Sequence, residues 1–172
     1  MLLSTRAALG PPGADSAIFR FLSRGRICLE RSWRCGTTSG TEVAFYVDTS
    51  ALVKLVVAEA ETTALRSWLT DGDRDLVSCD LVRTELMRAV RRIVPDRALQ
   101  ARAVLDSVTL VEVASSVFEE AGRLDPSVLR SLDAIHLASA LDLGDDLEGL
   151  VTYDDRLAEA AEANGVAAFS PR

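Results

Sequence analysis

From Val43 onward, short strand-like runs alternate with helix-like runs along the chain. Runs rich in β-branched and aromatic residues predict strands over residues 43–48, 76–79, 109–113, 149–152 and 166–169. Apolar residues at helical spacing predict helices over 50–57, 59–70, 81–94, 97–107, 116–123, 126–143 and 155–164. Gly165 is the predicted stop of the last helix. Alternation at these lengths predicts an α/β fold with a parallel sheet flanked by helices.

The first 42 residues differ from the rest of the chain. They contain six arginines and three acids, a charge of +3 that leaves −10 for residues 43–172. They also contain several Gly, Pro and Ser residues, and their longest apolar patch is short. We expect residues 1–42 to be a disordered extension, or to result from a start site assigned upstream of the true domain. The compact domain is expected over residues 43–172.

Composition excludes several classes of protein. The net charge of −7 argues against coating nucleic acid or anionic membranes by bulk charge. No apolar stretch is long enough to span a membrane, and the N-terminus lacks the apolar core of a signal peptide. Three cysteines at no metal-ligand spacing predict free thiols in a reducing cytoplasm. A single histidine excludes a multi-histidine metal site.

Four acids stand at unusual places in this pattern. Asp48 ends the first predicted strand, and Asp154 follows the fourth. Glu85 and Asp133 interrupt the apolar faces of two predicted helices. A buried carboxylate is costly unless it is paired or binds a metal, and the carboxyl ends of parallel strands meet at one edge of a sheet. The four acids are therefore candidates for a single site.

Such a site suits a hard divalent cation. Close carboxylates repel one another unless a cation neutralises them, and carboxylate oxygens favour Mg²⁺ or Mn²⁺. Such an ion can activate a water molecule and stabilise charge on phosphate. Metal-assisted hydrolysis of a phosphodiester is the reaction class that we expect.

Each acid also has a simpler interpretation. Asp48 can cap the helix that starts near Ser50, and Asp154 or Asp155 can cap the last helix. Glu85 can be a solvated helix residue beside Arg88. Taken singly, these interpretations are favoured for three of the four acids. The nearly all-apolar helix around Asp133 is expected to be buried, so that its acid needs a partner.

Other residues lie close to the acids in sequence. The hydroxyls of Ser50 and Thr152 are expected either to position the site or to cap helices, and Arg156 is a candidate phosphate contact. His136 is interpreted as a hydrogen-bonded core residue. The apolar run 51–57 fits a core helix or a partner surface. A locally basic segment, interpreted as a solvated face or as an RNA contact, is formed by Arg83, Arg88, Arg91, Arg92, Arg97 and Arg102.

Four segments carry a resemblance to the PIN-domain family, and most closely to its VapC-type toxins. They are Phe45-Tyr46-Val47-Asp48-Thr49-Ser50-Ala51-Leu52-Val53-Lys54, Arg83-Thr84-Glu85-Leu86, Ser131-Leu132-Asp133-Ala134-Ile135-His136-Leu137-Ala138-Ser139-Ala140 and Val151-Thr152-Tyr153-Asp154-Asp155-Arg156-Leu157. The resemblance implies a three-layer α/β/α fold and a Mg²⁺- or Mn²⁺-dependent endoribonuclease that cuts structured RNA such as tRNA or rRNA. It further implies a VapB-like antitoxin and a homodimer.

The same resemblance implies roles for the acids. Asp48 and Asp133 are the main metal ligands, and Glu85 and Asp154 complete the acidic site. Asp154 is preferred to Asp155 because the family's acid follows Thr-x. The alternative function is a catalytically silent PIN-like module that acts by binding a protein partner.

Overall fold

The centre of the fold is a sheet of five parallel strands, seen in a computed structural model that describes residues 43–72 and 74–172. The expectations for residues 1–42 lie outside the described residues. The strand order is β3-β2-β1-β4-β5. The strands are β1 (Ala44–Val47), β2 (Asp75–Cys79), β3 (Thr109–Val111), β4 (Leu147–Val151) and β5 (Ala168–Phe169).

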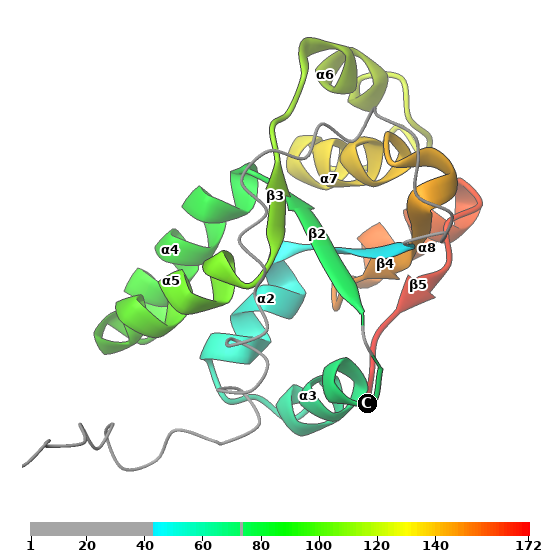
Figure 1. Cartoon of the computed structure of the whole chain (residues 1–172). Coiled ribbons are helices and arrows are strands. Elements are labelled where there is room, and N and C mark those ends of the chain that lie inside the picture. Colours follow the sequence, from blue (N-terminus) through cyan, green and yellow to red (C-terminus); the bar gives the residue numbers. More distant parts are fainter. Residues whose placement is uncertain (1–42, 73) are drawn as a thin grey trace, which may run out of the picture.

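Helices cover both faces of this sheet (Figure 1). They are α2 (Thr49–Val56), α3 (Thr62–Thr70), α4 (Leu81–Ile93), α5 (Ala98–Asp106), α6 (Ser115–Ala121), α7 (Ser131–Leu141) and α8 (Asp155–Ala163). Short 3-10 turns, η1 (Pro95–Arg97) and η2 (Gly144–Asp146), precede α5 and β4. Within the described ranges, every helix is too short or too polar to cross a membrane.

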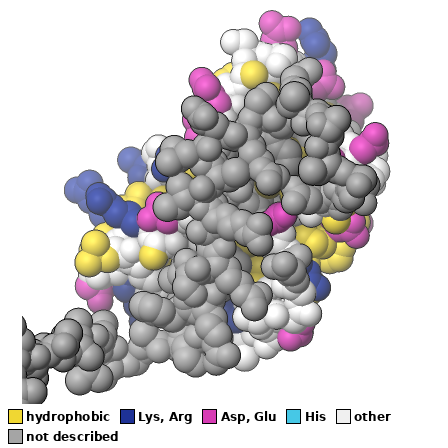
Figure 2. Space-filling model, viewed as in Figure 1, with side chains coloured by type: hydrophobic (Ala, Val, Ile, Leu, Met, Phe, Trp, Pro, Cys, Tyr) yellow, Lys and Arg dark blue, Asp and Glu magenta, His cyan; other side chains and the backbone are white. Residues whose placement is uncertain are grey.

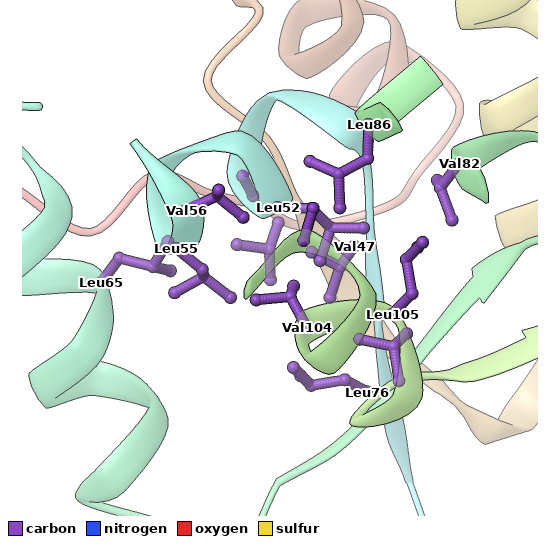
Figure 3. Packing of buried hydrophobic residues seen from close by; sticks show 14 of the residues in the cluster. Val47, Leu52, Leu55, Val56, Leu65, Leu76, Val82, Leu86, Val104 and Leu105 are labelled. Atoms are coloured by element: carbon purple, nitrogen blue, oxygen red, sulfur yellow. The ribbon is translucent and has the colours of Figure 1, made fainter. Parts of the chain in front are cut away.

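Two apolar cores hold the helices to the sheet. On one face, Val47 of β1 packs with residues of α2, α3, α4 and α5 (Figure 3). On the other face, the neighbouring Tyr46 packs with α7 and α8. Successive side chains of a strand point to opposite faces, so β1 supplies both cores. The predicted three-layer α/β/α fold is thereby confirmed.

The strand order reverses beside the central strand. From β1, the chain builds β2 and β3 on one side of the sheet and then β4 and β5 on the other. The ends of β1 and β4 are in register, with Val47 opposite Val151. In open α/β sheets, ligands bind at such a reversal of strand order, beyond the carboxyl ends of the strands. Asp48 and Thr152 follow these two strands directly.

The apolar run 51–57 belongs to the core. Ala51, Leu52, Leu55 and Val56 are all buried in the cluster between α2 and the sheet. Since β1 is covered on this face by α2, the run is accounted for by packing within the chain.

One helix begins later than the sequence predicts. The prediction started α7 at Pro126, whereas the helix starts at Ser131. Leu129 donates its backbone N–H to the Pro126 carbonyl in a turn, and Val128 is 84% exposed. Leu132 is also 48% exposed, so the first part of the apolar run does not enter the core. The expectation of a helix buried all round is wrong at this end, because the apolar pattern extends past the residues that pack.

The end of α8 matches its prediction. Gly165 has a φ of +79°, a conformation that favours glycine. Its N–H binds the Glu162 carbonyl at 3.0 Å, and the N–H of Val166 binds the Ala161 carbonyl at 2.9 Å. These two bonds form a Schellman motif that ends the helix.

Gly149 gives the first testable prediction, because β4 and β5 approach closely there. A Cβ at Gly149 would lie 2.7 Å from the Ala167 carbonyl oxygen and would overlap the Phe169 ring. We expect Gly149→Ala to lower the free energy of unfolding by about 1–3 kcal/mol, as for other overpacked sites. Urea denaturation measures this change.

Gly122→Ala is the matched control. Its Cβ would come no closer than 3.5 Å to any neighbour, and its φ is −70°. We expect its free energy of unfolding to change by less than about 0.5 kcal/mol or to rise slightly. Equal stability of the two variants would contradict the close approach at Gly149.

Candidate active site

Asp48 and Asp154 lie in the loops beyond the carboxyl ends of β1 and β4, and each is the N-cap of the helix that follows. Asp48 Oδ1 accepts the N–H of Ala51 at 3.2 Å at the start of α2. Asp154 Oδ1 accepts the N–H groups of Arg156 and Leu157 at 2.9 and 3.3 Å at the start of α8. The capping interpretation is therefore confirmed for both acids, and both caps lie where the strand order reverses.

Asp48 is held on both of its oxygens. Ser50 Oγ donates to Oδ1 at 2.7 Å, and Thr152 Oγ1 donates to Oδ2 at 3.1 Å. The residue is only 5% exposed. Burial raises the pKa of Asp48 above its usual value, although these hydrogen bonds oppose the shift. The chain therefore keeps this carboxylate in one orientation at an electrostatic cost.

The two hydroxyls also tie the strand ends together. Thr152 Oγ1 accepts the N–H of Asp154 at 3.0 Å, and Ser50 Oγ accepts the N–H of Tyr153 at 2.7 Å. The sequence singled out Ser50 and Thr152 as supporting residues, and the structure places both against Asp48. They connect the loop after β1 to the loop after β4.

Lys54 supports the same loop, and the sequence analysis missed it. It is 8% exposed on α2, and its Nζ lies 2.5 Å from Glu59 and 2.8 Å from Glu61. The ammonium also lies 4.6 Å from the centre of the Tyr153 ring, a cation–π contact. The signal in the sequence was a lysine inside an otherwise apolar run, with two acids within the next seven residues.

The end of the described chain holds this loop from the other side. Tyr153 Oη donates to the Pro171 carbonyl at 2.8 Å. Ser170 Oγ donates to the Thr152 carbonyl at 2.6 Å. The loop that carries Thr152 and Asp154 is therefore fixed by α2 and by residues 170–171.

Glu85 is attached to the core and not to its helical neighbour. Its Oε2 accepts Thr49 Oγ1 at 2.5 Å and lies 2.8 Å from His136 Nε2. The side chain is 23% exposed. Burial alone would raise the pKa of Glu85, but the bonds from His136 and Thr49 outweigh it and lower the pKa. The interpretation of Glu85 as a solvated residue beside Arg88 is wrong, because α4 turns this side chain towards α2 and α7.

His136 has the hydrogen-bonded core position expected from the sequence. It is 3% exposed on α7, and its Nδ1 lies 2.8 Å from Tyr46 Oη. Cys79 Sγ is 3.6 Å from the same nitrogen. Burial lowers the pKa of His136, but the contacts with Cys79 and Glu85 outweigh it and raise the pKa to about 10. The link to Glu85 was not foreseen, because residues 85 and 136 are distant in sequence.

Asp133, in the first turn of α7, lacks such hydrogen-bond donors. Its Oδ2 is buried and accepts no hydrogen bond in the described part of the chain. Burial raises the pKa of Asp133, and the charges of Asp154 and Glu85 raise it further, against the opposing charges of Arg130 and His136. Three of the predicted acids thus interact electrostatically across α7, α8 and α4.

The two residues after Asp154 take other positions. The Asp155 side chain is 90% exposed and lies 4.0 Å from Arg172. The Arg156 side chain is exposed and lines a hollow of about 600 Å³ together with Asp125 and Glu159. None of the four predicted acids lines that hollow. Asp154, and not Asp155, is one of the charges that raise the pKa of Asp133.

The donor set suits a divalent cation. The buried Oδ2 of Asp133 has no donor, and its neighbours Asp154 and Glu85 carry the same charge. A hard cation would supply the missing positive charge. In residues 43–72 and 74–172, no three acidic, histidine or cysteine side chains are gathered into a ready metal cluster. The carboxylates of Asp48 and Glu85 are instead held in place by hydrogen bonds from other residues of the chain.

Comparison with known proteins points to one family. A sequence model of the PIN domain matches residues 45–163. Ribonuclease VapC47 of Mycobacterium tuberculosis (strain CDC 1551 / Oshkosh) is 42% identical over 130 residues, which cover 73% of this chain and 96% of that protein. Ribonuclease VapC46 of Mycobacterium tuberculosis (strain ATCC 25618 / H37Rv) is 44% identical over 128 residues, which cover 74% and 98%.

Solved structures share the fold. The Mycobacterium tuberculosis toxin VapC20, which cleaves the sarcin-ricin loop, superposes with a TM-score of 0.62 at 19% identity and covers 74% of this chain and 100% of its own. A chain from a toxin-antitoxin complex of Klebsiella pneumoniae gives a TM-score of 0.57 at 20% identity, with 75% and 98% covered.

Asp133 gives a prediction on stability. Its pKa is higher in the folded than in the unfolded chain, so the stability of the folded chain falls as the pH rises above the usual carboxyl pKa of about 3.9. Asparagine does not ionise. With a chelator present, we expect Asp133→Asn to raise the free energy of unfolding at pH 7 and to leave it nearly unchanged at pH 3.

Urea titrations at the two pH values measure this difference. Asp155→Asn is the control, because its side chain is exposed and its replacement should change stability by less than about 0.5 kcal/mol. A loss of stability in Asp133→Asn at pH 7 would argue that the carboxylate is satisfied in the folded chain.

Proposed function

The chain belongs to the PIN-domain family, and we propose that it is the toxin of a toxin–antitoxin pair, a Mg²⁺- or Mn²⁺-dependent endoribonuclease that hydrolyses phosphodiester bonds in structured RNA. The observation that carries the proposal is the set of interacting carboxylates beside the switch point of the sheet, with a buried oxygen of Asp133 left without a donor. Four relatives that are 41–44% identical are named ribonucleases.

Asp48 and Asp133 would be the main ligands of the cation, with Glu85 and Asp154 completing the set. When bound, the cation supplies Lewis acidity to a water molecule and to the phosphate oxygens. Ser50 and Thr152 keep the Asp48 carboxylate in a fixed orientation, because each donates to one of its oxygens. Asp48 is 5% exposed, and burial of this kind strengthens the two hydrogen bonds.

An exposed arginine face on α4 fits the phosphates of RNA. Arg88 and Arg92 follow Glu85 by three and seven residues and therefore share its side of the helix. The side chains of Arg83, Arg88, Arg91 and Arg92 are exposed and make no ion pair or hydrogen bond within the described ranges. Dark blue side chains over α4 stand at the left of Figure 2. Because the whole chain carries a net charge of −7, the basic face on α4 is a local feature that the overall charge does not explain.

We propose tRNA or rRNA as the RNA and the cytoplasm as the place of action. A VapB-like antitoxin and a homodimer are proposed as the protein assemblies. One structural relative is part of a toxin-antitoxin complex, which supports the antitoxin proposal.

The alternative is a catalytically silent module that keeps the fold and acts by binding a partner. Retention of all four acids and of the hydroxyls around Asp48 favours an enzyme. A wild-type chain that cleaves no structured RNA in the presence of Mg²⁺ or Mn²⁺ would favour the module.

Cleavage assays test the catalytic proposal. We expect the full chain to cut structured RNA with Mg²⁺ or Mn²⁺ and to stop when EDTA removes the ion. Asp48→Asn and Asp133→Asn should reduce cleavage to background, because an amide is a poorer ligand for a hard cation than a carboxylate. RNA products are followed by gel electrophoresis, and circular dichroism checks the fold.

Asp154→Asn and Asp155→Asn are the matched pair within this test. Loss of activity is expected for Asp154→Asn only, because Asp154 lies beside Asp133 and Asp155 is exposed. Full cleavage by Asp48→Asn or Asp133→Asn would refute the assigned site. Loss in Asp155→Asn alone would reverse the choice of the fourth acid.

Salt dependence tests the arginine face. We expect the double variant Arg88→Gln/Arg92→Gln to raise KM for RNA while kcat stays near the wild-type value. On single-stranded RNA, the slope of log affinity against log salt should fall by about 0.7 for each phosphate that the variant no longer neutralises. Arg123→Gln is the control, since Arg123 pairs with Glu119 and Glu120 and should not bind RNA. Equal effects of both changes would mean that only total charge matters.

A further inference from the structure

The buried His136 links the core of the fold to one acid of the site. Its Nδ1 lies 2.8 Å from Tyr46 Oη of β1, and its Nε2 lies 2.8 Å from Glu85 Oε2 of α4. The ring is 3% exposed. Both nitrogens of the histidine are therefore engaged, one by the central strand and one by a site carboxylate.

The partners determine where the protons are. A carboxylate only accepts hydrogen bonds, so His136 Nε2 carries a proton and donates to Glu85 whether the ring is neutral or charged. Nδ1 accepts the Tyr46 hydroxyl proton in the neutral ring and donates to Tyr46 Oη in the charged ring. Tyr46 Oη also accepts the N–H of Cys79 at 3.2 Å. The bond to Glu85 is thus the same in both protonation states of the histidine.

Glu85 is held by one oxygen only. Its Oε2 accepts both Thr49 Oγ1 at 2.5 Å and His136 Nε2 at 2.8 Å. Its Oε1 accepts no hydrogen bond from residues 43–72 and 74–172. Glu85 is also one of the charges that raise the pKa of Asp133, and the proposed function counts it among the ligands of the cation. Two donors thus fix the carboxylate and leave its other oxygen available.

We propose that His136 is a positioning residue, which, with Tyr46 and Thr49, fixes the Glu85 carboxylate so that its free Oε1 is the oxygen offered to the divalent cation. This inference rests on the proposed function. In this role His136 acts through Glu85 and does not touch the substrate. Hydrogen-bond partners behind a metal ligand are known to orient it, and their loss typically lowers metal affinity about 10- to 100-fold.

A purely structural role predicts something different. His136 packs edge-on to Tyr46, with ring centres 5.9 Å apart, and contributes to the core by this contact. Were packing its only role, replacing it would lower stability and leave metal affinity unchanged in the folded protein. The two roles are separated by measuring the affinity for a metal, apart from stability and apart from activity.

The probe is Mn²⁺ alone, titrated into the full chain without RNA and followed by electron paramagnetic resonance. We expect His136→Leu to weaken Mn²⁺ binding about tenfold or more. His136→Gln should restore part of the affinity, because its amide N–H₂ can reach towards Glu85. Thermal unfolding without metal shows whether each variant is folded.

Tyr46→Phe covers the case in which His136→Leu does not fold. It removes one hydroxyl, releases His136 Nδ1 and should weaken Mn²⁺ binding by a smaller factor. Ser139→Ala is the matched control: Ser139 is also a buried hydroxyl, 4% exposed on α7, but it donates only to the Ile135 carbonyl. Unchanged Mn²⁺ affinity in folded His136→Leu or in Tyr46→Phe would overturn the proposal.

A double-mutant cycle tests whether the effect runs through Glu85. Glu85→Gln alone should weaken Mn²⁺ binding, and adding His136→Leu to it should cause little further loss. Equal loss from His136→Leu in both backgrounds would overturn the assigned role.

The proposed function fails in a different way. In that case, the wild-type chain would not bind Mn²⁺, or Asp48→Asn would keep both binding and RNA cleavage. If Asp48→Asn loses both while His136→Leu binds Mn²⁺ as the wild type does, only the inference about His136 is wrong.

Discussion

The structure depends on a buried carboxylate at the end of its central strand. Asp48 is 5% exposed, and its two oxygens are bonded to a residue after β1 and a residue after β4. The bond to Thr152 crosses the point where the strand order reverses, so the carboxylate joins the two halves of the sheet. Burial raises the pKa of Asp48, and the hydrogen bonds from the two hydroxyls oppose that shift. Asp48 thus follows the central strand, caps the next helix and belongs to the candidate site.

The acids of the candidate site differ in the hydrogen-bond donors that their carboxylates receive. Asp48 and Glu85 receive hydrogen bonds from side chains, whereas a buried oxygen of Asp133 receives none in the described part of the chain. The chain therefore fixes two of the carboxylates and leaves a buried oxygen of the third without a hydrogen-bond donor. An ionised Asp133 lowers the stability of the folded chain for this reason, and such a cost is often found at functional sites.

The sequence predicted the parallel sheet and the helices on its two faces, because these follow from local patterns, and it marked the four acids as candidates. β-branched runs, helical spacing and Gly165 are each visible within a few residues. The predicted start of α7 was wrong, because a run such as 128–132 does not reveal which of its apolar residues are buried in the core. The hydrogen bonds of Glu85 with His136 and Thr49 could not be predicted either, because they depend on how α4 packs against α2 and α7. Long-range contacts leave no periodic trace in the sequence.

The hydrogen bond between Thr152 and Asp48 also limits how early in synthesis the site can form. The two residues are 104 positions apart in the chain, so this bond closes only when most of the domain has been synthesised. Parallel strands brought together over such separations form slowly compared with local helices. β1 is the first strand of the described residues to be made, and β4 follows only about a hundred residues later. Until β4 and the loop after it have been made, Asp48 lacks the Thr152 hydroxyl and Asp154 is absent, so a growing copy holds an incomplete set of the four acids.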